Sequence, residues 1–370
     1  MAKRQQRRRD TRRAEHARTS ATRRRVLTGV GLSLGASLVT GATAHAATFE
    51  VDRSDDTGTV SACTVAPDDC NLRGAFAASN ASSSTYGDYI VFNSSVTGVT
   101  LTAGEIDITD AVYVYGNGAN ATTISGGNNS RIFYAHPGTS GGVVNFNYLT
   151  LTGGNAGSND GGAIYNLDAN LNIYGSVLTG NSAGDGGAIY DKGAYYNGYN
   201  TDVIGTTISQ NTASDDGGGF YAYESAGQVF NSTISGNAAS NYGGGIYMFS
   251  DSYLYDATIA GNSAARGGGI FADSGVHLLS NIVADNTAPA GPDVDGSANA
   301  GFSLLESLTG TALTSYPAGS NIAGQDPQLG PLQINGGSNP TPTRRPAATS
   351  PVDARRAVKA LACCSANWTR

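Results

Sequence analysis

The chain has 370 residues, and its 22 Lys and Arg against 29 Asp and Glu give a formal net charge of −7. It contains 51 Gly and 19 Tyr but only 11 Pro, together with abundant Asn, Ser and Thr. This composition argues against a disordered chain, which lacks aromatic and β-branched residues, and favours short strands joined by tight turns.

Residues 1–46 are predicted to be a signal peptide. Basic residues crowd the first 25 positions, and the mildly apolar run at 26–42 is too short and too rich in Gly to span a membrane stably. Arg23-Arg24-Arg25 just ahead of this run resembles a twin-arginine signal, with the Sec route as the alternative. Cleavage is expected between Ala46 and Ala47, after a small-x-small pattern.

Cleavage would make the chain strongly acidic. It removes 11 of the 22 basic and 2 of the 29 acidic residues, which leaves 11 against 27 and a net charge of −16. Nucleic acids and anionic membranes need a basic patch, so neither is an expected partner. The mature chain is expected to be secreted or extracellular, or associated with a cell surface, and to have no integral membrane segment.

Residues 47–84 are predicted to form an N-terminal cap. Cys63 and Cys70 lie seven positions apart, and after export this pair is expected to form a disulfide. A metal site is the weaker alternative, because no second Cys or His pair with zinc-like spacing accompanies them. Residues 71–80 predict a short helix with Leu72 and Phe76 on one face, suited to covering an open first coil.

Residues 85–340 predict an all-β fold, a single-stranded right-handed parallel β-helix. From residue 150 a Gly-Gly-x-Ile-Tyr unit recurs in steps of 25, 31, 26 and 24 residues. The segments between the units alternate with period two, as in Ser232-Thr233-Ile234-Ser235, so each repeat is expected to be one coil of strands. Residues 341–370 remain as a C-terminal tail, basic near its end and interpreted as aberrant or disordered.

An Asn runs in phase with the glycine unit. We expect these residues to form a structural ladder, because Asn tolerates a left-handed turn and its amide can bond to the Asn of the next coil. The predicted ladder comprises Asn155, Asn181, Asn211, Asn237, Asn262 and Asn286.

An aromatic residue follows the Ile of each unit and is therefore expected to point outward. The rings could stack on sugars, and an equally supported alternative is a self-stacked ladder that only stabilises the coils. This candidate glycan-stacking row comprises Tyr165, Tyr190, Tyr221, Tyr247 and Phe271.

Three Asp residues precede consecutive glycine units and are expected to lie one above another. Asp160, Asp185 and Asp216 would then form a weak candidate site for Ca²⁺, since carboxylates about 5 Å apart repel one another unless a cation lies between them. Solvent screening is the favoured alternative. No other cofactor is expected.

The sequence offers little for catalysis. Asn200-Thr201-Asp202 followed by Asp215-Asp216 superficially resembles the carboxylate signature of polygalacturonases, but the accompanying Gly-His-Gly and Arg-Ile-Lys patterns are missing. A uronate lyase would need a basic residue and calcium, and Lys192 and Arg266 stand apart from any local calcium-binding pattern. His136 and His277 are isolated, so no catalytic residue is assigned.

Two terminal motifs suggest a family. Cys70-Asn71-Leu72-Arg73-Gly74-Ala75-Phe76 resembles the opening motif of CSLREA-domain proteins, with Asn and Gly replacing the usual Ser and Glu. Residues 326–337 resemble the end motif of the choice-of-anchor Q group, and the coils between are similar to those of chlamydial polymorphic outer membrane proteins. The resemblance implies an exported bacterial β-helix and no common activity.

The sequence therefore leaves two classes of function open. The favoured one is an extracellular or cell-surface β-helix with a structural, adhesive or glycan-binding role, its partner a polysaccharide or a cell-surface component. The alternative is a carbohydrate-active enzyme, a polysaccharide lyase or a glycoside hydrolase acting on extracellular polysaccharide.

Overall fold

The computed structural model describes residues 45–57, 63–64, 66–82, 84, 86–138, 142–193, 200–249, 252–334 and 339–344. Nearly all of the predicted signal peptide, residues 1–44, and the tail from residue 345 lie outside these residues. Within them the chain forms a parallel β-solenoid, and α2 (Leu72–Asn80) is the only helix. No helix in the described part is long and apolar enough to span a membrane.

The largest sheet has 17 strands in two neighbouring sets. The a-strands are β4 (Ile106–Ile108), β7 (Phe133–Ala135), β10 (Ile164–Leu167), β14 (Ile189–Lys192), β18 (Phe220–Tyr223) and β22 (Ile246–Met248). The b-strands are β1 (Thr48–Val51), β2 (Asp88–Phe92), β5 (Val112–Tyr115), β8 (Val143–Asn147), β11 (Asn170–Tyr174), β15 (Asn200–Ile204), β19 (Ala226–Phe230) and β23 (Ser252–Tyr255). Strands β25 (Ile270–Leu279) and β27 (Val294–Gly301) continue both sets, and β29 (Thr311–Ser315) pairs with β27.

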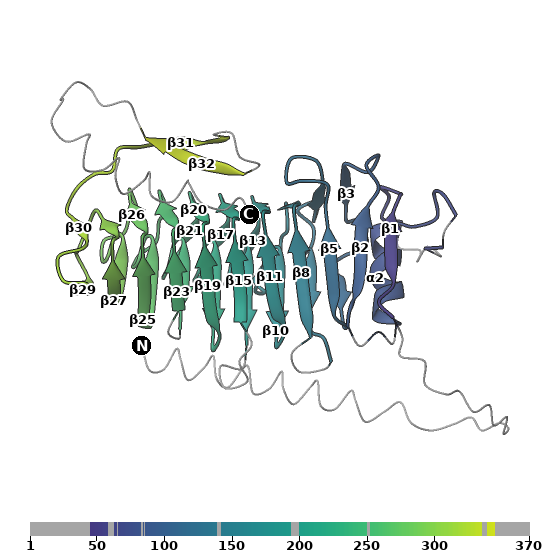
Figure 1. Ribbon diagram of the computed structural model, residues 1–370, viewed down its shortest axis with the longest axis horizontal. Helices are drawn as coiled ribbons and strands as arrows, with labels where there is room; N and C mark the ends of the chain where they lie inside the picture. Colours follow the sequence, from purple (N-terminus) through teal and green to yellow (C-terminus); the bar gives the residue numbers. More distant parts are fainter. Residues whose placement is uncertain are drawn as a thin grey trace. The chain divides into compact units, whose positions relative to one another are not determined.

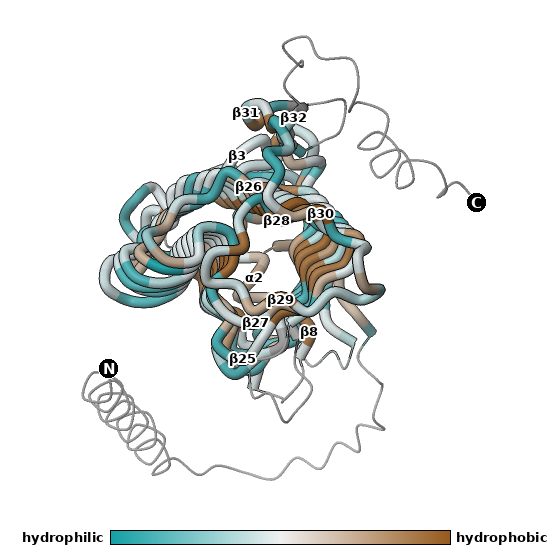
Figure 2. Tube along the Cα trace, turned by 90° about the vertical axis from the view of Figure 1, so that its left-hand side faces the viewer, coloured by the Kyte–Doolittle hydropathy of each residue, from teal (hydrophilic) through white to brown (hydrophobic). Residues whose placement is uncertain are grey.

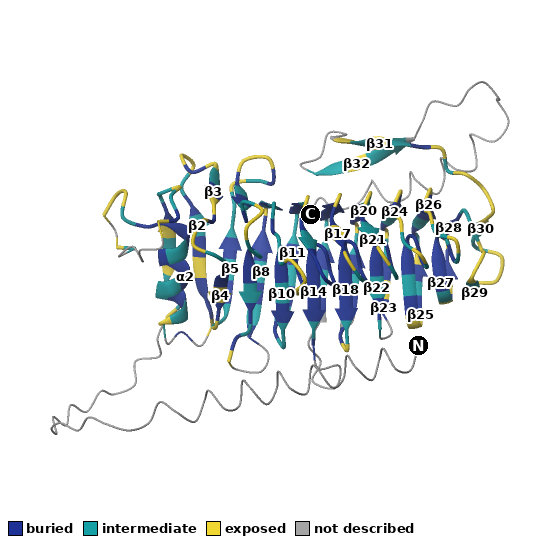
Figure 3. Cartoon of the chain, turned by 180° about the vertical axis from the view of Figure 1, so that it is seen from behind, coloured by how far each residue is buried: buried dark blue, intermediate teal, exposed yellow. Residues whose placement is uncertain are grey.

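A ten-stranded sheet forms a second face from the c-strands. These are β3 (Gly98–Thr100), β6 (Thr123–Ser125), β9 (Thr150–Thr152), β12 (Val177–Thr179), β16 (Thr207–Ser209), β20 (Thr233–Ser235), β24 (Thr258–Ala260), β26 (Ile282–Ala284), β28 (Leu304–Leu305) and β30 (Ile322–Ala323). A small third sheet contains β13 (Ser182–Ala183), β17 (Thr212–Ala213) and β21 (Ala238–Ala239). Figure 1 shows the b-strands side by side, and Figure 3 shows the a-strands from behind.

The glycine units stack in register, as the repeat predicts. Strands β10, β14, β18, β22 and β25 pair in parallel, and the inward residue of each unit is fully buried in one continuous core. Gly186 has φ +65°, in the left-handed region. A Cβ on Gly187 would lie 2.2 Å from the carbonyl oxygen of Gly218 in the next coil, so the second glycine is required by the close approach of the coils.

A cap covers the first coil, as predicted. The N-cap Asn71 of α2 accepts a hydrogen bond from Gly74 N, and Phe76 packs on Phe133 at 5.3 Å between ring centroids. Figure 2, a view along the coils, shows α2 within their ring. The predicted disulfide between Cys63 and Cys70 is confirmed.

Two strand pairings of the structure lie across the predicted domain boundaries. Strand β1 already pairs in parallel with β2, so the sheet of the solenoid begins inside the segment assigned to the cap. At the other end the last c-strand ends at Ala323, and β31 (Leu329–Ile334) pairs antiparallel with β32 (Pro340–Arg344), the C-terminal hairpin, which crosses the predicted boundary at 340. The hairpin returns to the c-strands, where Thr207 Oγ1 donates a 2.8 Å hydrogen bond to the Pro340 carbonyl.

Five of the six predicted ladder residues form a buried chain of hydrogen bonds. In Asn211, both the backbone N–H and Nδ2 donate to Asn237 Oδ1, at 3.0 and 2.9 Å, and Nδ2 also donates to the Leu178 carbonyl of the preceding coil. The same pattern links the rest of the chain, which comprises Asn181, Asn211, Asn237, Asn262 and Asn286. The side-chain amides of Asn211, Asn237 and Asn262 each make hydrogen bonds with four polar groups of the adjoining coils.

Asn155 is not part of this ladder. It pairs with Ser182, one position away, and the ladder position is taken by Gly154, whose N–H donates to Asn181 Oδ1 at 2.8 Å. Its side chain bonds instead to the Asn128 carbonyl, near the surface. The prediction for Asn155 was wrong because the register runs unbroken from Thr152, opposite Thr179, to Asn155, opposite Ser182, which leaves a glycine at the ladder position of this coil.

The ladder leads to a stability prediction. Asn237→Ala should lower the free energy of unfolding by about 1–3 kcal/mol, because it leaves buried groups of two coils without partners. Asn155→Ala, which removes an amide outside the buried chain, should cost less. Thermal or denaturant unfolding of both variants provides the measurement, and equal losses would contradict the structural role of the ladder.

Candidate functional site

The outward aromatic residues of the glycine units lie in one row and stack on each other. Consecutive ring centroids are 5.0, 5.1, 4.4 and 5.1 Å apart. Arg131 lies over the Tyr165 ring and Arg266 over the Phe271 ring, with the guanidinium carbon 5.1 and 5.5 Å from the ring centroids. The row comprises Tyr165, Tyr190, Tyr221, Tyr247 and Phe271.

This stacking leaves little ring surface for a sugar. Tyr190 is 1 % exposed and Tyr221 3 %, and burial raises the pKa of Tyr221 well above its usual value. The premise that the row presents free ring faces is therefore wrong: alternation correctly places the rings outside the core, but their faces are covered by one another. The geometry is that of the self-stacked ladder.

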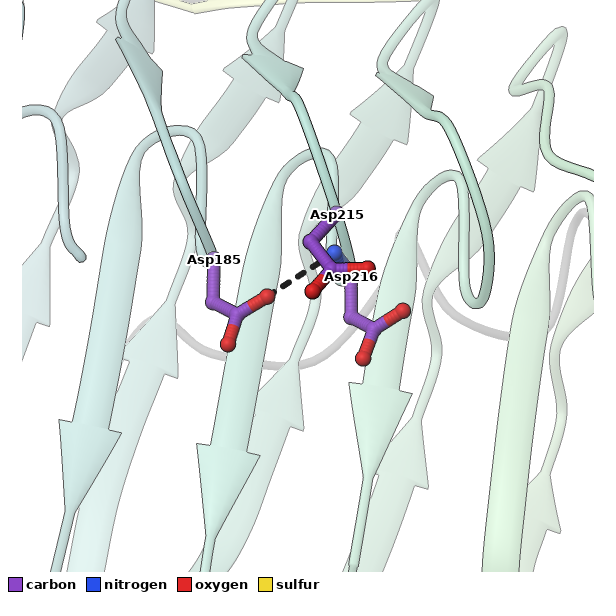
Figure 4. A group of neighbouring side chains, drawn as sticks. All are labelled: Asp185, Asp215 and Asp216. Atoms are coloured by element: carbon purple, nitrogen blue, oxygen red, sulfur yellow. Dashed lines mark hydrogen bonds between the residues drawn. The ribbon is translucent and has the colours of Figure 1, made fainter. Parts of the chain in front are cut away.

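Two of the three predicted calcium ligands come together, and Asp160 does not join them. The carboxylate oxygens of Asp185, Asp215 and Asp216 lie within 4.8 Å of one another, with Asp185 on one coil and the other two on the next (Figure 4). Asp185 Oδ1 accepts a 3.0 Å hydrogen bond from Asp216 N, and Asp216 Oδ1 accepts one from Tyr242 N at 3.2 Å.

These hydrogen bonds account for the position of the buried carboxylates without a metal ion. Asp215, the member that the sequence reading missed as a ligand, also accepts a hydrogen bond from Asn241 Nδ2. Carboxylate oxygens are the donors that Ca²⁺ prefers, but it takes six to eight of them. Three carboxylates, two of them engaged by backbone N–H groups, are a partial fit, so calcium binding stays a prediction.

The residues considered for catalysis do not assemble. Asp202 lies on β15, a b-strand, whereas Asp215 and Asp216 lie in the turn between β17 and β18. Arg266 is held by Asp295 through two hydrogen bonds of 2.7 and 3.1 Å. His277 stacks on Tyr253 at 4.6 Å between ring centroids. Among the described residues these groups have structural neighbours rather than a common site.

A row of mainly polar side chains lies on the outer face of the b-strands. One outward position per coil forms a row in continuous parallel register, which we name the axial polar row. It comprises Tyr113, Asn145, Asn172, Asp202, Gln228, Tyr253 and His277. Sequence reasoning missed it because its members differ in type, although counting back from the Asn ladder would have shown that they share a phase.

The solenoid also encloses a polar group inside its core. Asp191 points inward from β14, is 1 % exposed, and accepts hydrogen bonds from Asn166 Nδ2 at 2.7 Å and from the Ser225 hydroxyl. Burial raises the pKa of Asp191 to about 6 in spite of these donors. Asp191 was not singled out from the sequence, although it lies two residues after the inward Ile189 and alternation along the strand therefore also places it inward.

Comparison with known families gives one short match. Residues 175–192 match the Chlamydia polymorphic membrane protein repeat, over a segment that includes Asn181 and the unit Gly186 to Tyr190. The comparison with curated proteins gives no match, and that with solved structures gives none. The repeat and the β-helix together point to a protein of the cell-surface or outer-membrane type. The CSLREA and choice-of-anchor Q resemblances stay predictions.

Asp191 leads to a pH prediction. Its pKa is 3.8 in the unfolded reference and about 6 in the fold, so between these values the folded protein holds the extra proton and its stability falls as the pH rises. The loss from this group should reach about 3 kcal/mol by neutral pH. Asp191→Asn should remove that part of the slope, as measured by denaturant unfolding from about pH 4 to pH 7. An unchanged slope would contradict the prediction.

Proposed function

We propose that this chain is an exported cell-surface β-helix protein that binds glycans and does not turn them over. The observation that carries the proposal is the unbroken parallel register, which repeats each outward side chain about every 4.8 Å along the solenoid. Solenoids use such extended surfaces for binding long partners. The candidate catalytic groups, in contrast, are dispersed or occupied by structural contacts.

Export is supported by the predicted signal peptide, by the Cys63–Cys70 disulfide and by the similarity to a repeat of membrane proteins. The acidic charge of the mature sequence disfavours nucleic acids and anionic membranes as partners. A polysaccharide or a glycosylated cell-surface component remains as the partner that fits best.

The proposal predicts binding without turnover. Exported protein should bind extended neutral glycans on an array, with affinity that rises with chain length because each coil adds a weak contact. Incubation with the same glycans, with and without calcium, should release neither reducing ends nor unsaturated products. Depolymerisation would favour the alternative of a lyase or hydrolase, and a failure to bind any glycan would contradict the proposal.

A further inference from the structure

The axial polar row differs from the ladders of the interior. Inside the coil each ladder amide is bonded to its neighbours, whereas among the described residues the side chains of Asn145, Asn172, Asp202 and Gln228 make no hydrogen bond with the protein. Packing of the coils therefore does not account for this run of amide and carboxylate groups on four successive b-strands. An unbonded polar row needs water or a ligand.

Two oxygen atoms of the row are covered by the protein itself. Asn145 Oδ1 and Asp202 Oδ1 are buried from solvent and have no hydrogen-bond partner. Burial also raises the pKa of Asp202, which records the loss of water around its carboxylate. A ligand on this face cannot reach these two covered atoms; the groups of the row that remain open to one are the other carboxylate oxygen of Asp202 and the side-chain amides of Asn172 and Gln228.

Aromatic side chains lie at both ends of these four residues. Tyr89 and Tyr113 stack at 5.3 Å beyond Asn145, and Tyr253 lies beyond Gln228, 37 % exposed and parallel to Tyr255 at 6.2 Å. Central polar groups flanked by aromatic rings provide hydrogen bonds to hydroxyls together with apolar contact for C–H surfaces.

The occupant is further defined by charge and access. Asp202 contributes the only charged side chain to the four central positions, and the mature sequence is acidic, so an anionic polysaccharide is disfavoured. The described residues of the C-terminal hairpin and Asn339 bond to the neighbouring c-strand side, at Thr207, Ser176 and Gly205, and none of these hydrogen bonds involves the row. One polar side chain about every 4.8 Å suits an extended chain that presents hydroxyls at each sugar.

We propose that the axial polar row binds a neutral, hydroxyl-rich glycan chain laid along the solenoid axis. This rests on the proposed glycan-binding function and adds its site and ligand class. The amides of Asn172 and Gln228 hydrogen-bond sugar hydroxyls, the Asp202 carboxylate accepts a hydrogen bond from a sugar hydroxyl, and Tyr253 provides an apolar contact at one end.

The test compares matched variants of the full exported protein against neutral glucan and mannan oligomers of increasing length, measured by calorimetry. Asn172→Ala combined with Gln228→Ala should weaken binding of long oligomers about tenfold, the value of two neutral hydrogen bonds. Tyr253→Ala should weaken it as well. Controls are Asn129→Ala and Tyr86→Ala, which alter exposed residues outside the row and should leave affinity unchanged.

The results distinguish failure of the proposed site from failure of the proposed glycan binding. Unmodified protein that binds no neutral oligomer overturns the proposed function and the site together. Binding that survives in the double variant, or falls equally in the controls, overturns the site and leaves glycan binding itself standing. Unfolding curves of every variant accompany the titrations, and loss of affinity with an unchanged midpoint supports the site.

Discussion

The fold depends on the bonding of each coil to the next by buried amides. Stacked coils must close within about 4.8 Å, and at the turn the backbone groups of neighbouring coils cannot all reach one another. The row from Asn181 to Asn286 solves this, since a side chain such as that of Asn211 accepts hydrogen bonds from the coil before it and donates to the coils on both sides. A second buried row at the b-to-c corner works similarly, with Ser176 N bonded to Thr206 Oγ1 and Thr206 N to Ser232 Oγ. Together they fix the register, and the register fixes every outward surface.

Fixed register has opposite consequences on different faces. In the aromatic row the rings stack on one another, so their faces are covered and the row stabilises the coils. Where polar side chains line up without hydrogen-bonding one another, as from Asn145 to Gln228, they leave hydrogen-bonding groups unused. In this solenoid the regular aromatic row is therefore weaker evidence of a binding site than the less regular axial polar row.

Much of the fold could be predicted from the sequence because its constraints are local. Gly186 needs a left-handed backbone, Gly187 lies against a carbonyl of the next coil, and the Ile of each unit alternates inward. Asn155 was misplaced by one position, since Gly154 occupies the ladder position of its coil. The site could not be predicted in the same way, because burial of Tyr190 depends on rings from other coils. The return of the hairpin to Thr207 depends likewise on contacts more than 130 residues apart.

The most direct test of this account is site-resolved hydrogen exchange of the backbone amides of Asn181, Asn211, Asn237 and Asn262, each of which donates to the side chain of the next Asn. These four amides should exchange only through global unfolding, at rates equal to those of the central residues of the buried strands. Exchange as fast as in the exposed turn around Gly319 would show that the amide row does not hold the coils in register, and the surfaces derived from that register would lose their basis.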